Sequence, residues 1–213
     1  MRIVKLERKA AFVWMEQKHY AHTRTNVKEV FGLLEGSVVE GVCCFGNPVC
    51  KSYVNFLGTK TFELARLCVN EGLPKNTLSK FVAGSLKMLP KPAIVVSFAD
   101  ANQGHHGYIY QATNWIYTGA GKPYKAFVRD GKEVHKKTLH RLGFNTTEFF
   151  SGMGFHTENR LGKHRYFFIV ASSKKERKAI TKKLLEHYER LPYPKGDNTR
   201  YDSGDDIVQR LDL

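Results

Sequence analysis

The sequence predicts an α/β fold with one central sheet of mixed strand direction. Strand and helix patterns alternate through the middle of the chain, which is typical of α/β domains. A glycine-containing turn between two apolar runs comes both before and after this region, and such turns join antiparallel strands. The chain has 213 residues, of which 42% are hydrophobic, so it can form one sizeable core.

Local patterns place the elements of the first half. Apolar alternation predicts strands, and apolar residues at helical spacing predict helices. Glu35-Gly36-Ser37 lies between two apolar runs and therefore predicts a hairpin. In order, the elements are a strand at 3–6, a helix at 10–20, hairpin strands at 30–34 and 38–45, and a strand at 62–69 that contains Arg66.

The second half begins with a helix that Asn76 caps and that Pro90 ends. A nearly continuous apolar run at 93–98 follows, as expected for a strand buried on both faces. Ser173 and Glu176 form a capping-box pattern before an amphipathic C-terminal helix. The remaining elements are a short helix at 105–113, a strand at 115–118 and a strand at 166–171. Two further strands form a hairpin, one on each side of Asp130-Gly131.

The overall charge predicts a polyanionic partner. The chain has 34 Lys and Arg residues against 20 Asp and Glu residues, a formal net charge of +14. A surplus of this size on a folded chain most often serves binding to nucleic acid or an anionic membrane. No apolar run is long enough to span a membrane, and the N-terminus lacks the apolar core of a secretory signal. We therefore expect a cytoplasmic protein without a membrane partner.

Two segments, residues 122–141 and 174–195, each have a net charge of +5. In the second segment the lysines fit the solvated face of a helix. In the first, Asp130-Gly131 predicts a hairpin that presents basic side chains along a two-stranded ribbon, which suits a DNA backbone or groove. The predicted DNA-binding residues of this hairpin are Lys125, Arg129, Lys132, Lys136 and Lys137.

The C-terminal end has the opposite charge. Residues 197–213 contain five Asp against two Arg, a net charge of −3, and prolines and glycines interrupt the region. We expect a single domain over residues 1–195, followed by an acidic and flexible tail at 196–213.

Polar side chains at the ends of the central strands are the best candidates for chemistry, because open α/β sheets bind ligands there. Asp100 follows the strand at 93–98, where it can act as a base or metal ligand, or cap the next turn. Tyr110 is either a proton donor or a core tyrosine with a satisfied hydroxyl. Arg66 must pair with an anion, either a ligand or Glu63.

Histidine groups raise the question of a metal. His19 and Tyr20 lie at the end of the first helix, and His105 and His106 follow Asp100. Imidazole, phenolate and carboxylate ligands together suit iron. Adjacent histidines point in different directions on a helix, so at most one of His105 and His106 should serve as a ligand.

Several motifs follow one another in a fixed order over about residues 60–170. They are FELARLCV at 62–69, LPKN at 73–76, SFAD at 97–100, GYIYQATNW at 107–115 with Tyr117 and Gly119 beyond it, and GKHRY at 162–166. Together these motifs resemble the phage Mom family of DNA adenine modification proteins. The resemblance implies a fold similar to the GNAT acetyltransferases, in which a mixed, mostly antiparallel sheet is flanked by helices.

This resemblance implies a phage-encoded enzyme in the host cytoplasm that converts adenine N6 in double-stranded DNA into a carbamoylmethyl derivative, which protects phage DNA from restriction. The partner would be a DNA duplex from which the adenine is flipped out. Acetyl-CoA or a related acyl donor is the implied cofactor, with iron as a further candidate. The glycine-rich pyrophosphate loop of ordinary GNAT proteins is replaced here by residues 70–76.

The family's functional residues map by motif onto positions of this chain. Arg66, Asp100 and Tyr110 would be catalytic: Asp100 accepts the N6 proton, Tyr110 donates to a leaving group, and Arg66 orients a carboxylate or phosphate. The expected cofactor contacts are Arg66, Asn76 and either Ser79 or Ser85. The expected metal ligands are His19, Tyr20 and Asp100. Apart from this mapping, the aromatic ring of Trp115 near the cleft is expected to contact DNA as a stacking surface.

Two other classes of protein stay open. An N-acetyltransferase that acts on a protein or small molecule needs the same sheet but no large basic surface. A noncatalytic DNA-binding protein needs the charge, but not Arg66, Asp100 and Tyr110 converging at strand ends. The nitrogen source, the recognised DNA sequence and the oligomeric state are not fixed by the sequence, and a homodimer is one option.

Overall fold

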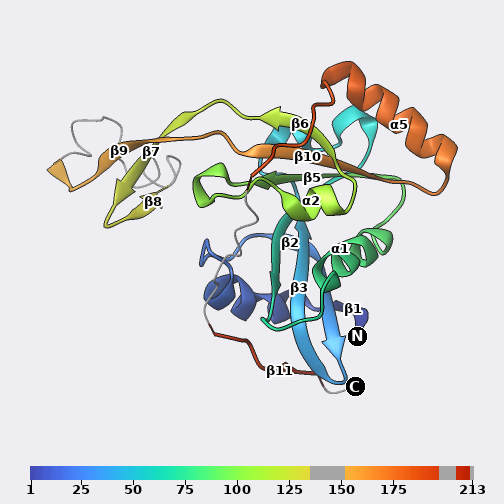
Figure 1. The fold of residues 1–213 in the computed structure, drawn as a ribbon, viewed down its shortest axis with the longest axis horizontal. Helices are drawn as coiled ribbons and strands as arrows, with labels where there is room; N and C mark the ends of the chain where they lie inside the picture. The colour runs from blue at the N-terminus through green and yellow to red at the C-terminus, as the bar shows by residue number, and fades with distance from the viewer. Residues whose placement is uncertain (135–151, 197–204, 212–213) are drawn as a thin grey trace.

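The computed structural model describes residues 1–134, 152–196 and 205–211 (Figure 1). A large sheet with helices packed against it forms the body, and a smaller sheet extends from one end (Figure 1). Of the predicted DNA-binding residues, Lys136, Lys137 and the side chain of Lys132 lie outside the described part.

The large sheet has the strand order β1-β2-β3-β4-β5-β10-β6, and β11 pairs with β3. Its described pairings are antiparallel except for that of β4 with β5. The predicted α/β class with a mixed, mostly antiparallel sheet is therefore confirmed. The strands are β1 (Arg2–Leu6), β2 (Val27–Glu35), β3 (Val38–Gly46), β4 (Thr61–Val69), β5 (Ala93–Ala99), β6 (Ile116–Ala120), β10 (His164–Val170) and β11 (Gln209–Arg210).

The strands β4 and β5 pair only over their first halves. Residues 61–63 pair with residues 94–96, and beyond this point the end of β5 pairs only with β10 on its other side. The strand β4 contains one extra residue opposite Cys44 and Phe45 of β3, which is a β-bulge. Beyond this bulge, the side chains of β4 alternate in the opposite sense between the two faces of the sheet. The carboxyl ends of both strands therefore separate, and they border the site described below.

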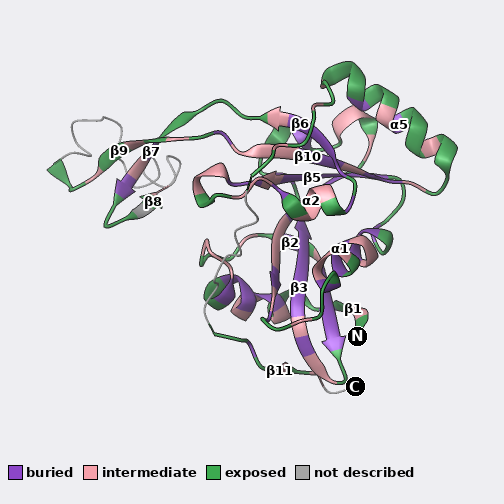
Figure 2. Cartoon of the chain, viewed as in Figure 1, coloured by how far each residue is buried: buried purple, intermediate pink, exposed green. Residues whose placement is uncertain are grey.

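In the described part of the chain, three regular helices cover the sheet. The helix α1 (Thr77–Lys87) packs Phe81, Val82 and Leu86 into the main core, and each is at most 1% exposed. The short helix α2 (Tyr108–Ala112) begins three residues later than predicted. The helix α5 (Lys174–His187) buries Ile180 and Leu184 and leaves its basic outer face exposed (Figure 2). No described helix is long and apolar enough to cross a membrane.

The predicted helix at 10–20 is instead a 3₁₀ turn, η1 (Arg8–Ala11), followed by a π-helix, η2 (Trp14–Lys18). The wider π turn directs Trp14, Met15 and Lys18 inward, where each is at most 1% exposed. Sequence periodicity assumes 3.6 residues per turn and so did not reveal this irregularity. The shorter turns are η3 (Lys51–Tyr53), η4 (Phe56–Gly58) and η5 (Ala101–Gln103).

The smaller sheet forms an arm that extends away from the body (Figure 1). It consists of β7 (Tyr124–Arg129), β8 (Lys132–Val134) and β9 (His156–Arg160), in the order β8-β7-β9, and we call it the basic arm. The predicted hairpin at Asp130-Gly131 is confirmed: both residues have positive φ, at 52° and 71°, as a two-residue type I′ turn requires. The strand β9 was not predicted.

The C-terminal residues 205–211 pack against the body. Ile207 is 8% exposed, and its backbone N–H and C=O bond the side-chain amide of Asn70, at 2.9 and 3.0 Å. Lys18, whose side chain is fully buried, lies 2.8 Å from Oδ1 of Asp206. This part of the expected flexible tail is therefore held by specific contacts, whereas residues 197–204 lie outside the described part.

Replacing Asp206 with asparagine should destabilise the fold at neutral pH, because it removes the carboxylate partner of buried Lys18. The hydrogen bond from Lys18 and that from the Glu71 N–H lower the pKa of Asp206. The pKa of Asp206 is thus lower in the folded protein than in the unfolded chain, where it is about 3.9. The ionised carboxylate therefore stabilises the fold at pH values above about 3.9, and this stabilisation disappears as the pH falls through the folded-state pKa. The melting-temperature gap between wild type and D206N should therefore close towards pH 2. Asp205→Asn is the control and should melt like wild type; an equal effect of both changes would contradict the assignment.

Candidate active site

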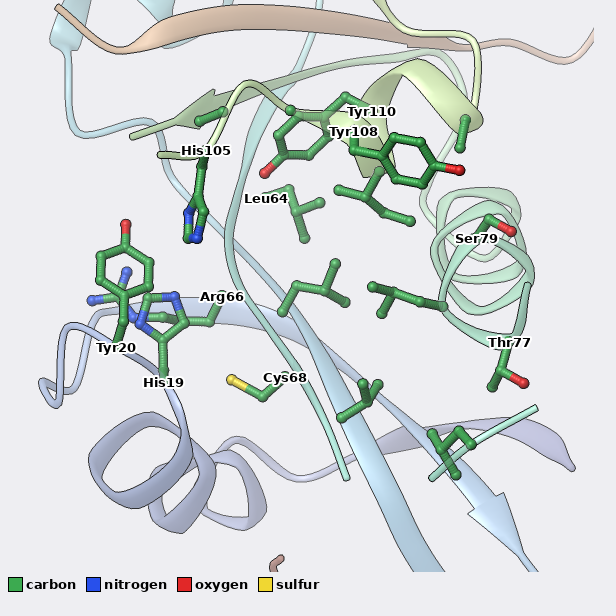
Figure 3. A pocket seen from close by; sticks show the side chains of 18 of the residues that line it. His19, Tyr20, Leu64, Arg66, Cys68, Thr77, Ser79, His105, Tyr108 and Tyr110 are labelled. Carbon is green, nitrogen blue, oxygen red and sulfur yellow. The ribbon is translucent and has the colours of Figure 1, made fainter. Parts of the chain in front are cut away.

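The main cavity lies where β4 and β5 separate, and its volume is about 570 Å³. Side chains from segments far apart in the sequence meet there (Figure 3). Its lining comes from the end of η2, the second half of β4 with the loop 70–76, the start of α1, and the segment from the end of β5 to α2. The cavity thus lies at strand carboxyl ends, as open α/β sheets favour.

Asp100 lines the cavity at the end of β5 and is 8% exposed. Its Oδ1 accepts hydrogen bonds from the backbone and side-chain N–H groups of Asn102, both at 3.0 Å, and its Oδ2 lies 2.9 Å from Nζ of Lys163. Burial acts to raise the pKa of Asp100, but Lys163 and the two Asn102 bonds together outweigh it and lower this pKa. Asp100 is therefore an ionised acceptor at neutral pH, and it also caps η5.

Lys163 is a further candidate residue, for which the sequence did not predict a role. It lies between β9 and β10, and although burial acts to lower its pKa, the hydrogen bond and charge of Asp100 raise it. A side chain at the preceding Gly162 would overlap the backbone of Gly121, so two glycines allow this close approach. The Gly-Lys pair is the only sequence signal for the contact with Asp100. It is a weak signal, because a lysine in a turn is normally exposed to solvent.

A second contact supports this arrangement. Asn102 accepts a hydrogen bond from the N–H of Leu161 at 2.8 Å and donates to its C=O at 3.1 Å. The loop after β5 and the segment that leads out of the basic arm are therefore joined twice, through Asp100–Lys163 and through Asn102–Leu161.

Tyr110 lines the cavity from α2, and its hydroxyl lies 2.7 Å from Oγ of Ser97 on β5. Figure 3 shows this hydroxyl directed towards the cavity. Burial is the largest cause that raises the pKa of Tyr110 well above its ordinary value. Its ring centroid lies 5.0 Å from those of Trp115 and Tyr166, which fix its orientation. Tyr110 is therefore a neutral hydroxyl at physiological pH, suited to donating a proton or hydrogen bond.

Gly107 should tolerate no side chain, because it has a φ of 82° and a Cβ there would overlap the ring of Tyr166. Gly58 has a similar φ of 71° but open space around it, so Gly58→Ala is the matched control. Positive φ costs alanine about 1–2 kcal/mol at either site, and overlap adds about 1–3 kcal/mol at Gly107. Thermal unfolding should therefore show G107A melting several degrees below G58A; equal melting temperatures would argue against the ring contact.

Arg66 lines the cavity from β4 and has no carboxylate partner among the described residues. Its terminal nitrogens donate to the C=O of Ala65 at 2.7 Å and to the C=O and hydroxyl of Thr23 at 3.3 Å. Its Nε is buried without a hydrogen-bond partner in the described structure. Glu63, the alternative partner, instead accepts the N–H of Val49. The guanidinium is therefore suited to binding an anionic ligand.

His19, Tyr20 and His105 form an aromatic cluster at one end of the cavity (Figure 3). The ring centroids of His19 and Tyr20 are 4.4 Å apart, and the Tyr20 ring meets His105 edge-on at 5.6 Å. Burial, followed by the charge of Arg66, lowers the pKa of His19 to about 3, so this ring is neutral. Its Nδ1 accepts the N–H of Ala21 at 3.1 Å, which assigns the ring proton to Nε2.

The expected metal ligands His19, Tyr20 and Asp100 all line one cavity, and their assignment stays a prediction. Among the described residues, no group of three or more side chains drawn from His, Cys, Asp and Glu alone could hold a metal. Nδ1 of His19 accepts the Ala21 N–H here, so a metal that binds this ring would have to replace that hydrogen bond or the proton on Nε2.

The predicted cofactor residues divide between the cavity and the core. Asn76 and Ser79 line the cavity at the start of α1, where the hydroxyl of Ser79 donates to the C=O of Asn76 at 2.9 Å. The Asn76 side chain makes no capping hydrogen bond, although the residue precedes α1 as predicted. Ser85 is fully buried and is not among the lining residues, so Ser79 is the serine that can reach a ligand.

Of the predicted DNA-binding residues that the structure describes, one is buried in the core and others are exposed on the basic arm. Trp115 is 1% exposed and packs in the main core, so it offers no stacking surface, contrary to expectation. Its position directly before β6 places it between Tyr110 and Phe168. Lys125 and Arg129 are exposed on β7, and Arg129 lies 3.4 Å from the carboxylate of Asp130. The basic arm therefore presents these two cations to solvent.

The chain is similar to one protein family, to a curated relative and to a solved structure. The profile of the Mom protein family matches residues 1–195. A curated relative, the methylcarbamoylase mom of Escherichia phage Mu, is 24% identical over 194 residues, which cover 85% of this chain and 78% of that protein. Among solved structures, yncA of Salmonella typhimurium, an acetyltransferase candidate determined with its cofactor acetyl-CoA, matches 81% of this chain and 95% of its own, with 10% identity and a TM-score of 0.46. Because the family profile covers most of the sequence, including every cavity-lining segment, this chain belongs to the Mom protein family.

Proposed function

We propose that this protein is a phage DNA modification transferase that converts adenine N6 in double-stranded DNA into a carbamoylmethyl derivative and so protects phage DNA from host restriction. The observation that carries the proposal is the convergence of Arg66, Asp100 and Tyr110 on one cavity in a member of the Mom family. The methylcarbamoylase activity in the name of the phage Mu relative supports the same reaction class.

The protonation states assign a role to each of the three side chains. Asp100 is ionised and can accept a hydrogen bond from the exocyclic amine, then its proton as the new bond makes N6 acidic. Tyr110 remains protonated and can donate to a leaving group. Arg66 has no carboxylate partner in the described structure and its Nε has no hydrogen-bond partner there, so its guanidinium can orient an anionic part of the donor.

An acyl-CoA is the proposed cofactor, and the residues present fit such a group in two respects. The cavity extends along the separated half of β4 to the start of α1, whose first N–H groups are not capped by the Asn76 side chain. Lys75 lines the same end, so phosphate groups would meet a helix N-terminus and a cation. When bound, the acyl-CoA would supply the two-carbon unit, and its thioester carbonyl would be the carbon that takes up the amide nitrogen as the CoA thiol leaves.

Simple acetyl transfer does not yield the proposed product. An acetyl group would join N6 through its carbonyl carbon, whereas a carbamoylmethyl group joins through a methylene carbon and contains an additional nitrogen. A further reactant must therefore supply that nitrogen, and a two-electron oxidant is also needed if N6 joins the methyl carbon of an acetyl group, because a C–H bond is replaced by a C–N bond. His19, Tyr20 and Asp100 would be the residues to hold a metal ion at this cavity, and no step of the proposal is routed through it.

Double-stranded DNA is the proposed partner, with the basic arm as its binding surface. Lys125 and Arg129 are exposed there, and the segment leading out of the arm ends at Lys163, which contacts Asp100. Adenine N6 is paired inside a duplex, so the base must be flipped out at a cost of about a few kcal/mol. Lys163 lies three positions beyond Arg160, the last residue of β9, so the chain leads from the arm directly to the partner of Asp100.

The test is to express the protein in bacteria and determine the mass of every nucleoside in the cellular DNA. A new adenine nucleoside that carries a carbamoylmethyl group supports the proposal. Unmodified DNA together with an acetylated protein or small molecule would instead favour an N-acetyltransferase. Unmodified DNA and tight duplex binding would favour a noncatalytic DNA-binding protein.

A further inference from the structure

Ser97 bridges β4 and β5 at the point where the two strands separate. Residues 61–63 of β4 pair with residues 94–96 of β5, so Leu64 and Ser97 are the next residues along the two strands. The Ser97 hydroxyl lies 2.9 Å from the C=O of Leu64. Ser97 is 1% exposed and is not one of the described residues that line the cavity. A side-chain hydrogen bond thus takes the place of backbone pairing at the base of the cavity.

The same hydroxyl also contacts Tyr110. Oγ of Ser97 lies 2.7 Å from the Tyr110 hydroxyl, which is directed towards the cavity (Figure 3). A serine hydroxyl has one hydrogen, and a carbonyl oxygen can only accept. The Ser97 hydrogen can therefore serve either Leu64 or Tyr110, but not both at once. These two arrangements give Tyr110 opposite roles towards a ligand.

In the first arrangement, Ser97 donates to the C=O of Leu64 and accepts the hydrogen of the Tyr110 hydroxyl. Both hydrogen bonds then lie within the protein, and the Tyr110 hydrogen is not offered to the cavity. This arrangement is favoured while the cavity holds no acceptor, because Leu64 is buried and a buried carbonyl that loses a hydrogen bond is destabilising.

In the second arrangement, Ser97 turns about its Cα–Cβ bond and donates to the oxygen of Tyr110. The Tyr110 hydrogen can then point to an acceptor in the cavity. If Tyr110 gives up its proton, the resulting phenolate keeps the hydrogen bond from Ser97, and such a bond to a charged oxygen is stronger than one to a neutral oxygen. Burial is the largest cause that raises the pKa of Tyr110, whereas the hydrogen bond with Ser97 acts to lower this pKa.

We propose that Ser97 is a positioning residue that holds the Tyr110 hydrogen while the cavity is empty and, by turning from Leu64 to Tyr110, releases it to a leaving group. The proposal deepens the proposed function, on which it rests, by naming the group that prepares Tyr110 as a proton donor. Ser97 acts through Tyr110 and does not itself touch the ligand.

The proton balance of this step follows from the two arrangements. Tyr110 gives its proton to the sulfur of the departing CoA, as the carbon–sulfur bond breaks with its electron pair on sulfur and an amine nitrogen bonds to the carbonyl carbon. The proton that this nitrogen loses goes to water, and water returns one to Tyr110. Ser97 keeps its own proton throughout and only changes its acceptor.

Exchange of the Tyr110 hydroxyl hydrogen with solvent tests the holding role without any cofactor. The chain is labelled with tyrosine that carries ¹³C at Cζ, and spectra are recorded in equal parts of H2O and D2O. A hydroxyl that exchanges slowly gives separate Cζ signals for its protonated and deuterated forms, whereas fast exchange gives one averaged signal. The Tyr110 signal is the one that is missing from Tyr110→Phe.

The wild type should give separate signals for Tyr110, because Ser97 holds the hydrogen. Ser97→Ala should give one averaged signal, because the hydrogen then faces the cavity. Ser97→Cys keeps the size of the side chain but is only a weak donor and acceptor, so it should also exchange faster and serves if Ser97→Ala does not fold. An averaged signal in the wild type, or separate signals in the folded Ser97 variants, would overturn the proposal.

Thr61→Val is the matched control for the loss of a buried hydroxyl. Thr61 lies on the paired half of β4, is 5% exposed and is not one of the described cavity-lining residues. Its hydroxyl also serves two partners, since it donates to the C=O of Thr59 at 3.0 Å and accepts the N–H of Phe56 at 3.2 Å. Removing it should leave the separate signals of Tyr110 unchanged.

The extent of adenine modification in cellular DNA, measured before modification is complete, tests the releasing role. Ser97→Ala should form about tenfold less carbamoylmethyl-adenine than the wild type, as expected for the loss of one hydrogen bond to a charged group. Thr61→Val should match the wild type. The affinity for CoA, measured by calorimetry, should be the same in Ser97→Ala and wild type, whereas a general structural fault would weaken it.

These measurements separate the proposal from the proposed function. If the wild type modifies DNA and folded Ser97→Ala modifies it to the same extent, the releasing role of Ser97 is wrong and the function stands. If the wild type forms no modified adenine, the proposed function is wrong and the release to a leaving group falls with it. Hydrogen exchange in the same proteins still decides whether Ser97 holds the Tyr110 hydrogen.

Discussion

Replacing Asp100 with asparagine should reduce carbamoylmethyl-adenine in cellular DNA by at least about a hundredfold, the usual contribution of a proton-accepting group. The substitution keeps the size of the side chain but removes its negative charge, its pairing with Lys163 at 2.9 Å and its ability to take a proton. The measurement is the ratio of modified to unmodified adenine nucleoside by mass spectrometry. Full modification by the D100N variant would end the assignment of Asp100.

Glu29→Gln provides a matched control for this change. Glu29 also pairs with a lysine, Lys5, at 2.7 Å, but the pair lies on β1 and β2 away from the cavity, so modification should be unaffected. Lys163→Met gives a second readout, because removal of the cation should raise the pKa of Asp100. The acidic limb of the pH–activity profile should then move to higher pH, since Asp100 must be ionised to act. A loss of activity without this shift would show that Lys163 acts only through folding.

Elements with local signals were predictable from the sequence. Asp130-Gly131 specifies a two-residue hairpin because both positions adopt positive φ, and the capping box at Ser173 and Glu176 specifies the start of α5. The apolar run of β5 also predicted a buried strand, and with it the position of Asp100 at a strand end. In each case the chemistry of a few consecutive residues determines the local structure.

Contacts between distant segments were not predictable in this way. Asn70 recognises Ile207 through two hydrogen bonds across 137 positions of sequence, and neither residue shows a local signal for that pairing. The strand β9 has the sequence HTENR, which lacks apolar alternation because both of its faces are largely polar. It forms by pairing with β7, a tertiary interaction that overrides its weak strand propensity.

The difference between local signals and contacts between distant segments also explains which residues of the candidate site were predictable. Asp100, Tyr110 and Arg66 are identified by motif and do share one cavity. Lys163 lies within the GKHRY motif, but the sequence alone assigns it no role, because its partner lies 63 positions earlier in the chain. Residue type alone suggests a stacking surface at Trp115, and burial excludes it. Residue type thus indicates which chemistry is possible, whereas burial decides which side chains can perform it.

Replacing Lys125, Arg129, Lys132, Lys136 and Lys137 together with alanine should greatly weaken duplex binding and make it less sensitive to salt. Removal of one cation that neutralises a phosphate lowers the slope of log affinity against log salt concentration by about 0.9, so removal of five lowers it by about 4–5. Affinities measured by fluorescence anisotropy on a labelled duplex at several salt concentrations give this slope. Thermal unfolding should be nearly unchanged, because Lys125 and Arg129 are exposed and the carboxylate that pairs with Arg129 is itself in solvent.

The exposed face of α5 supplies the matched control, since it carries five lysines whose replacement changes the net charge by the same amount. These residues are Lys174, Lys175, Lys178, Lys182 and Lys183. If binding reflects a specific surface, the arm variant should show a much weaker salt dependence and the α5 variant should keep most of it. Equal reductions would mean that the net charge of +14 attracts DNA without a defined binding surface, and the basic arm would then have no special role. The arm is favoured because the segment that leads out of it reaches Asp100 through Lys163, so DNA bound there would lie next to the cavity.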